Sequence, residues 1–266
     1  MPEDARACLE RRALRPRGGV LLARTTLRHF ALITYALPLA RLAAHVPDER
    51  YEVLAFPIEG ERRALLSVVP FLDVDFRFPR LAPFPRFSFG QTNHRVYVRD
   101  RRTGEPMAWF LGTTLGSPLV AVPRWLWRLP WHRAHYRFDC AYDRERARFA
   151  RYAIAIESRW CNGTIELEDS GEPAGLLPGF ASLDEQILLL THPVAGAFRR
   201  LDGRHGGYSI WHPEMRLTVA RPRRLHFDLY ERLGLLSRAE MARPHSALLA
   251  PEVEFDIHLP PRRLDA

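Results

Sequence analysis

The amino-acid sequence predicts an α+β fold in which a mostly antiparallel sheet curls into a closed or cone-shaped β-barrel with a few short helices. Three observations predict it: long segments alternate between apolar and polar residues, helical patterns are short, and 22 Pro and 16 Gly mark frequent turns. With 266 residues, 47% of them hydrophobic, the chain can bury a core without a metal or disulfides. No βαβ rhythm is present, which disfavours a doubly wound nucleotide-binding fold.

Strands are predicted where every second residue is apolar, and turns where Asn-Gly or Asp-Gly interrupts that pattern. Alternation covers residues 134–142, 148–157 and 253–259. Asn162-Gly163 predicts a two-residue hairpin turn that returns through residues 164–168. Asp202-Gly203 predicts another turn ahead of residues 208–212, and His205-Gly206-Gly207 is interpreted as a turn rather than a phosphate-binding loop.

Four short helices are expected, each from a start or stop signal. They are residues 39–46 after Pro38, residues 119–129 after Ser117-Pro118 with a kink at Pro123, residues 187–190 after a Ser182/Glu185 capping box, and a helix along Leu225, Leu229 and Leu233 capped by Gly234. No Ser/Gly-rich linker divides the chain. The predicted organisation is a flexible tail over residues 1–18, a single barrel domain over 19–262 and a short tail over 263–266.

Composition and charge exclude several kinds of function. All 39 basic residues are Arg, so no lysine amine exists for a Schiff base or a P-loop. The net charge of +8 comes from arginines scattered among 31 acids, which predicts no nucleic-acid partner. The longest apolar run, residues 30–40, is too short to span a bilayer, and no secretion signal is present. Three cysteines without CxxC spacing fit a reducing, cytoplasmic location.

One predicted strand is polar on one side. Gln91, Asn93, Arg95, Tyr97 and Arg99 share a face, and His94 points the other way. If the sheet closes on itself, this face lines a cavity in which Arg95 binds a carboxylate while Asn93 and Tyr97 orient it, with Gln91 nearby. The alternative is a strand face exposed to water.

Histidines and tryptophans supply further candidates. His94, His135 and His212 are candidate acid or base residues, with the position of His94 opposite Arg95 counting against it. His132 and His135 are poorly spaced for a metal on a strand, and neither a metal nor a cofactor is expected. Trp125, Trp127 and Trp131, interleaved with arginines, predict core packing, a ligand lid or a dimer face.

Several of these segments resemble a known family. The strand Asn93-His94-Arg95-Val96-Tyr97-Val98-Arg99, the following Trp109-Phe110 pair and the ending from Pro244 to Pro261 are similar to the YqjF-like uncharacterised conserved proteins of bacteria. The resemblance spans about residues 19–262. It implies the acetoacetate-decarboxylase-like superfamily, a closed antiparallel barrel with a ligand cavity, and it favours the cavity interpretation of the polar strand.

The departures from that family bear on chemistry. Acetoacetate decarboxylase works through a lysine Schiff base, so that route is closed to a chain without lysine. Many members carry an acid near the position of Gln91 and a Ser-Leu-Asp run after the Trp-Phe pair, where this chain has Gly112, Thr113 and Thr114. The resemblance therefore transfers a fold but no activity.

The sequence supports two functional hypotheses. In the first, the cavity binds a small, anionic organic acid or polar metabolite, with lysine-independent acid/base chemistry of the lyase or hydratase type as an open possibility. In the second, the chain is a non-enzymatic interaction protein with a packed barrel and a Trp-rich contact surface. Neither includes a membrane or nucleic-acid partner, and a homodimer is compatible with both.

Overall fold

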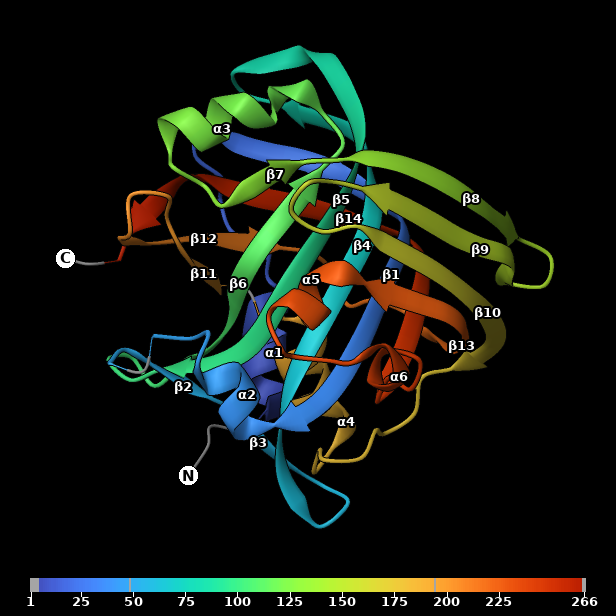
Figure 1. Ribbon diagram of the computed structural model, residues 1–266. Helices are drawn as coiled ribbons and strands as arrows, with labels where there is room; N and C mark the ends of the chain where they lie inside the picture. The colour runs from blue at the N-terminus through green and yellow to red at the C-terminus, as the bar shows by residue number, and fades with distance from the viewer. Residues whose placement is uncertain (1–4, 48, 194, 265–266) are drawn as a thin grey trace.

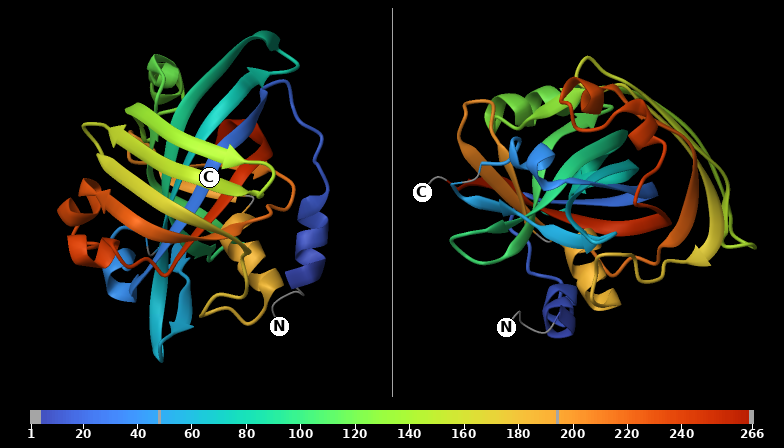
Figure 2. Two further views of the ribbon diagram at one scale, coloured as in Figure 1. Left: turned by 90° about the vertical axis from the view of Figure 1, so that its right-hand side faces the viewer. Right: turned by 60° about the horizontal axis from the view of Figure 1, so that its bottom comes forward.

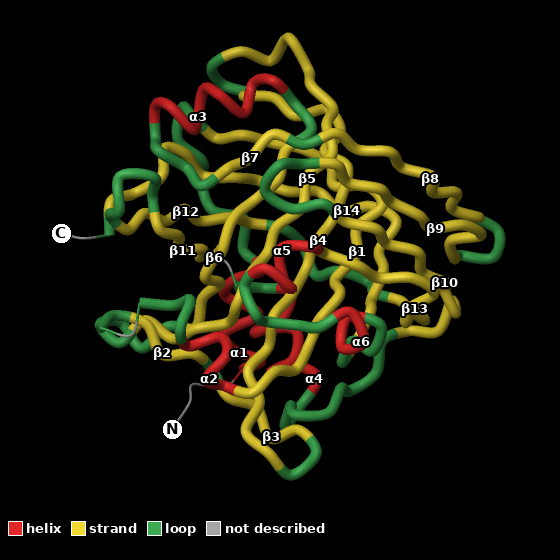
Figure 3. The backbone as a smooth tube through the Cα atoms, viewed as in Figure 1, coloured by secondary structure: helices red, strands yellow, loops and turns green. Residues whose placement is uncertain are grey.

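The computed structural model describes residues 5–47, 49–193 and 195–264, and strands dominate the described chain (Figures 1 and 3). The helical elements are α1 (Ala5–Ala13), α2 (Leu39–Ala43), η1 (Pro118–Val120), α3 (Ala121–Leu126), α4 (Leu183–Gln186), the π-helical turn η2 (Ile187–Thr191), α5 (Asp228–Arg232) and α6 (Arg238–Met241). The strands are β1 (Leu22–Pro38), β2 (Tyr51–Val53), β3 (Ala55–Ile58), β4 (Glu61–Phe78), β5 (Ala82–Asp100), β6 (Pro106–Leu115), β7 (Trp131–Arg133), β8 (His135–Asp143), β9 (Arg148–Glu157), β10 (Gly163–Pro173), β11 (Ala195–Arg199), β12 (His205–Trp211), β13 (Thr218–Phe227) and β14 (Ser246–Arg263).

Seven of the strands close into a ring. The order runs β1-β4-β5-β6-β11-β12-β14, and β14 pairs again with β1. Every neighbouring pair in the ring is antiparallel except β6 and β11, which are parallel. Leu22 pairs with His258 and Thr34 with Ser246, so the closing seam runs along most of β1. The predicted α+β class, with a mostly antiparallel closed sheet and few short helices, is confirmed.

A second layer of strands continues the sheet from β14. Near its start, β14 pairs with β13 through Leu248 and Leu249, whereas its later half pairs with β12. The order β13-β10-β9-β8 then continues outward, and these strands curve away from the ring and wrap over one side of it (Figure 2). The ring strands are therefore covered on that side, and their outward-facing side chains are buried as well.

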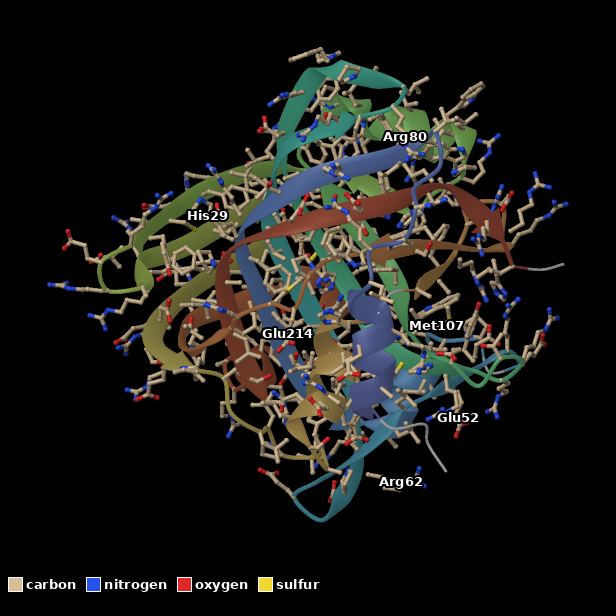
Figure 4. The ribbon with its side chains drawn as sticks, turned by 180° about the vertical axis from the view of Figure 1, so that it is seen from behind. His29, Glu52, Arg62, Arg80, Met107 and Glu214 are labelled. Atoms are coloured by element: carbon tan, nitrogen blue, oxygen red, sulfur yellow. The ribbon has the colours of Figure 1, made fainter. Side chains whose placement is uncertain are left out.

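Successive side chains along the ring strands point to opposite faces of the sheet, and each face belongs to a separate hydrophobic core. Ile33, Leu66 and Val96 face outward and pack with the strands of the second layer. Their neighbours Leu32, Leu65 and Tyr97 belong to the core inside the ring. The register between β1 and β4 shifts after Arg28, where His29, labelled in Figure 4, adopts a φ of 53°. The His29 ring centroid lies 5.9 Å from that of Phe149 on β9.

Part of the segment predicted as an N-terminal tail is helical in the structure. Residues 5–13 form α1, whose buried Cys8 and Leu9 pack against Leu188 of η2. Beyond the helix, the Arg15 guanidinium lies 4.4 Å above the Trp211 ring and donates to Asp256 of β14. These partners are distant in sequence, so local patterns did not reveal them. Residues 1–4 and 265–266 of the two predicted tails lie outside the described residues, and β14 extends to Arg263.

Three local predictions are corrected. Leu225 belongs to β13, so the fourth helix is only α5, although Gly234 does follow it with a φ of 66°. Antiparallel β9 and β10 do form the predicted hairpin, but residues 158–162 connect them and Asn162 donates to Asp228 instead of forming a two-residue turn. His205-Gly206-Gly207 lies in β12, because β11 and β14 offer pairing partners on both sides.

Among the described helices, none combines the length and the apolar character that crossing a membrane requires.

Candidate functional site

The ring encloses a cavity of about 80 Å³, lined by side chains or backbone from all seven of its strands. At roughly 10–15 Å³ for each water, this volume holds about five to eight water-sized groups. The lining includes seven polar residues, Asp73, Gln91, Asn93, Arg95, Thr191, Tyr208 and His212. The remaining lining is almost entirely apolar: Leu27, Phe30, Val69, Phe71, Phe76, Phe89, Phe110, Leu115, Leu129, Trp131, Pro193, Gly196, Ile210, Met215, Phe255, Ile257 and Leu259.

Arg95 is the cationic group of this cavity. It projects inward from β5 and is 8% exposed. One of its terminal nitrogens donates to the Leu190 carbonyl over 2.6 Å, while its Nε, also buried, has no hydrogen-bond partner among the described residues. No carboxylate of the described chain lies within ion-pair distance of it. A buried guanidinium with a spare donor is suited to bind an anionic oxygen.

The rest of the predicted polar strand divides into two parts. Gln91 and Asn93 line the cavity, where Gln91 Nε2 donates to Asn93 Oδ1 over 3.1 Å and Thr113 donates to the same oxygen. Tyr97 lies deeper in the inner core, and its hydroxyl is 2.7 Å from Ser67 Oγ. The Arg95 guanidinium lies 5.6 Å from the centre of the Tyr97 ring. Tyr97 therefore supports Arg95 and does not line the cavity.

Asp73 is a cavity residue that the sequence reasoning missed. It lies on β4, is 2% exposed, and its Oδ2 is buried without a hydrogen-bond partner among the described residues. Burial raises the pKa of its carboxyl to about 7, although the Thr25 hydroxyl opposes the rise. The available signal was a lone acid on the otherwise apolar face that Val69, Phe71 and Asp73 share.

His212 closes one end of the cavity directly after β12. Its two ring nitrogens each lie 2.8 Å from a backbone carbonyl oxygen, those of Thr191 and Pro213. Burial lowers the pKa of the ring despite these two contacts. Because backbone oxygens occupy both nitrogens, His212 acts as part of the wall and has no nitrogen turned to a ligand.

The other two candidate histidines lie outside the cavity. His94 faces outward from β5, as alternation predicts, and its Nδ1 is 2.8 Å from the Tyr230 hydroxyl. Burial there lowers its pKa to about 3. His135 is exposed at the start of β8, in the outer layer. Neither ring reaches the lining residues, so neither belongs to the same site as Arg95.

The tryptophans separate by position. Trp131 lines the cavity, Trp127 is partly buried against the small core around Phe110, and Trp125 of α3 is 71% exposed. In Figure 1, α3 lies near the β4–β5 hairpin at the top of the molecule. No group of three or more His, Cys, Asp or Glu side chains that could hold a metal occurs in the described ranges.

A closed, mostly antiparallel ring around a buried cavity, with a second sheet wrapped over it, defines the acetoacetate-decarboxylase-like class of folds. The model of the family DUF2071, described as an uncharacterised conserved protein, matches residues 24–254. The chain belongs to that family. The predicted membership in an uncharacterised family with this fold is confirmed.

Solved structures of enzymes share the fold. The enduracididine biosynthesis enzyme MppR complexed with pyruvate is 12% identical, with a TM-score of 0.58 over 95% of this chain and 92% of that one. Acetoacetate decarboxylase from Legionella pneumophila is 15% identical, with a TM-score of 0.55 over 95% and 92%. An acetoacetate decarboxylase-like enzyme from Sphingomonas wittichii RW1 is 11% identical, with a TM-score of 0.56 over 93% and 94%. No curated protein matches the sequence.

Proposed function

We propose that the protein binds a small organic acid inside the ring, with the carboxylate of the acid on Arg95. The observation that carries the proposal is the unpartnered, buried Nε of Arg95 in an enclosed cavity. A guanidinium in such a place gains a strong, charge-assisted hydrogen bond when an anion arrives. Asn93 and Gln91, which line the same cavity, orient the ligand next to the carboxylate.

One comparison supports this class of ligand, and two further observations disfavour other functions. The similar fold of MppR is described in complex with pyruvate, which is a small 2-oxo acid. Schiff-base decarboxylation is closed to this chain, because all 39 of its basic residues are Arg. The open interior also disfavours the alternative of a solidly packed ring that serves only as an interaction scaffold.

The binding proposal is tested with Arg95→Met and the matched control Arg99→Met. Arg99 lies four residues further along β5 at an exposed position, where its side chain donates to the Gly104 carbonyl. We expect pyruvate, butanoate or hexanoate at a hundred times its dissociation constant to stabilise the wild-type protein by about 2.7 kcal/mol. Arg99→Met keeps this thermal shift, and Arg95→Met abolishes it. An equal shift in both variants would refute the role of Arg95.

For lysine-independent chemistry of the lyase or hydratase type, we propose Asp73 as the proton-transfer group. It is the carboxyl group in the cavity, its Oδ2 is unpartnered, and a pKa of about 7 lets it accept or donate a proton near neutral pH. Carboxylates that carry a hydroxyl group or a double bond at the end of the chain far from the carboxylate are incubated with wild-type and Asp73→Asn protein. We expect turnover in the wild type and a rate at least about 100-fold lower in the variant. Equal turnover in Asp73→Asn would exclude this role.

A further inference from the structure

The two charged side chains of the cavity stand at opposite ends of it. Asp73 of β4 pairs with Phe89 of β5, six residues before Arg95 on the same strand. At about 3.3 Å per residue, their positions along the sheet are about 20 Å apart. Arg95 also points to the Leu190 carbonyl, at the end of the ring closed by η2. Arg95 and Asp73 are therefore too far apart to form an ion pair with each other. Arg95 Nε and Asp73 Oδ2 are both buried without a hydrogen-bond partner among the described residues.

Apolar side chains form most of the wall between these ends. Phe30 of β1, Phe71 of β4 and Ile210 of β12 contribute to it, together with Phe255, Ile257 and Leu259 of β14. The polar stripe on β5 is partly satisfied within itself, because Gln91 donates to Asn93. The cavity of about 80 Å³ extends between the positions of Arg95 and Asp73, so it is narrow for its length. A thin, unbranched apolar chain fits it better than one that is branched or hydroxylated along its length.

From these observations we infer that the ligand is a monocarboxylate with an unbranched apolar chain, which extends from Arg95 toward Asp73, and that Asp73 rejects a second carboxylate at the far end. This inference rests on the proposed function, since it places the carboxylate on Arg95. It adds the chemistry of the remainder of the ligand and assigns Asp73 a role in specificity.

The selectivity follows from desolvation and like charge. An alkyl chain loses no hydrogen bonds when it passes along Phe71 and Ile257, and each methylene gains from leaving water. A terminal carboxylate would be buried beside the Asp73 carboxyl, whose Oδ2 has no partner among the described residues. Two acids in one dry site cannot both ionise without a large penalty.

The experiment measures dissociation constants by calorimetry for butanoate, hexanoate, octanoate and decanoate, and for the dicarboxylate of each length. We expect affinity to rise about threefold to fourfold per methylene until the chain fills the cavity. At the best length, the dicarboxylate binds at least about tenfold more weakly than the monocarboxylate. Asp73→Asn keeps the shape of the side chain, and we expect it to reduce the ratio of the dicarboxylate dissociation constant to the monocarboxylate dissociation constant. Asp75→Asn, an exposed acid two residues away, leaves it unchanged.

Each failure has a separate meaning. If short acids bind through Arg95 but affinity does not depend on chain length, the inference of an apolar chain is wrong and the proposed function stands. If the ratio of dicarboxylate to monocarboxylate affinity is the same in wild type and Asp73→Asn, Asp73 does not determine specificity. If no carboxylate binds at any length, the proposed function itself is wrong.

Discussion

Asp73→Asn is expected to stabilise the protein at pH 8 and to leave its stability nearly unchanged at pH 4. Burial raises the pKa of this carboxyl from 3.8 to about 7 in the folded state. The folded protein therefore binds more protons than the unfolded chain between these two values, and the wild type loses stability as pH rises through this window. A shift of about 3 units corresponds to about 4 kcal/mol above pH 7. Asparagine is neutral at every pH and escapes this loss.

Urea unfolding at pH 4, 6 and 8 measures this effect as the difference in unfolding free energy between variant and wild type. Using the difference cancels the titration of the other groups. Asp75→Asn is the control, because Asp75 is exposed and pairs with Arg86. A difference that stays constant from pH 4 to pH 8 would show that Asp73 is not held in its neutral form by the fold.

Arg95→Met is expected to raise the unfolding free energy of the ligand-free protein by about 2 kcal/mol. Burying a guanidinium without a carboxylate partner costs several kcal/mol of hydration, and an apolar side chain of similar length avoids that penalty. The contact with the Tyr97 ring and the hydrogen bond to Leu190 offset only part of it. The same variant is expected to lose the proposed carboxylate binding, so stability and binding would change in opposite directions.

Chemical denaturation without ligand measures the unfolding free energies of the wild type, Arg95→Met and Arg99→Met. Arg99 is exposed, so its replacement should change the unfolding free energy by no more than about 0.5 kcal/mol. A clear loss of stability in Arg95→Met would mean that Arg95 is structural, since its hydrogen bond to η2 would then outweigh its desolvation.

Alternation predicted the strands well because one face of each is buried, and it correctly separated Arg95 from His94 across β5. Alternation did not predict features whose structure depends on contacts between residues far apart in the sequence. The helix α1 buries only Cys8 and Leu9, which pack against Leu188, and Arg15 just after it binds Asp256, 241 residues away. Asp73 was missed because a single acid in a strand has no local partner pattern, and its meaning depends on closure of the ring.

The pairing of the first long strand with the last one bears on how the chain is made. During synthesis β1 emerges before β14, so Leu22 must wait for its partner His258. Until then one edge of β1 lacks its partner, and the cavity walls contributed by β12 and β14 do not exist. Folding that depends on such distant contacts is slow. A circular permutant that joins β14 directly to β1 would place the two seam strands next to each other in translation.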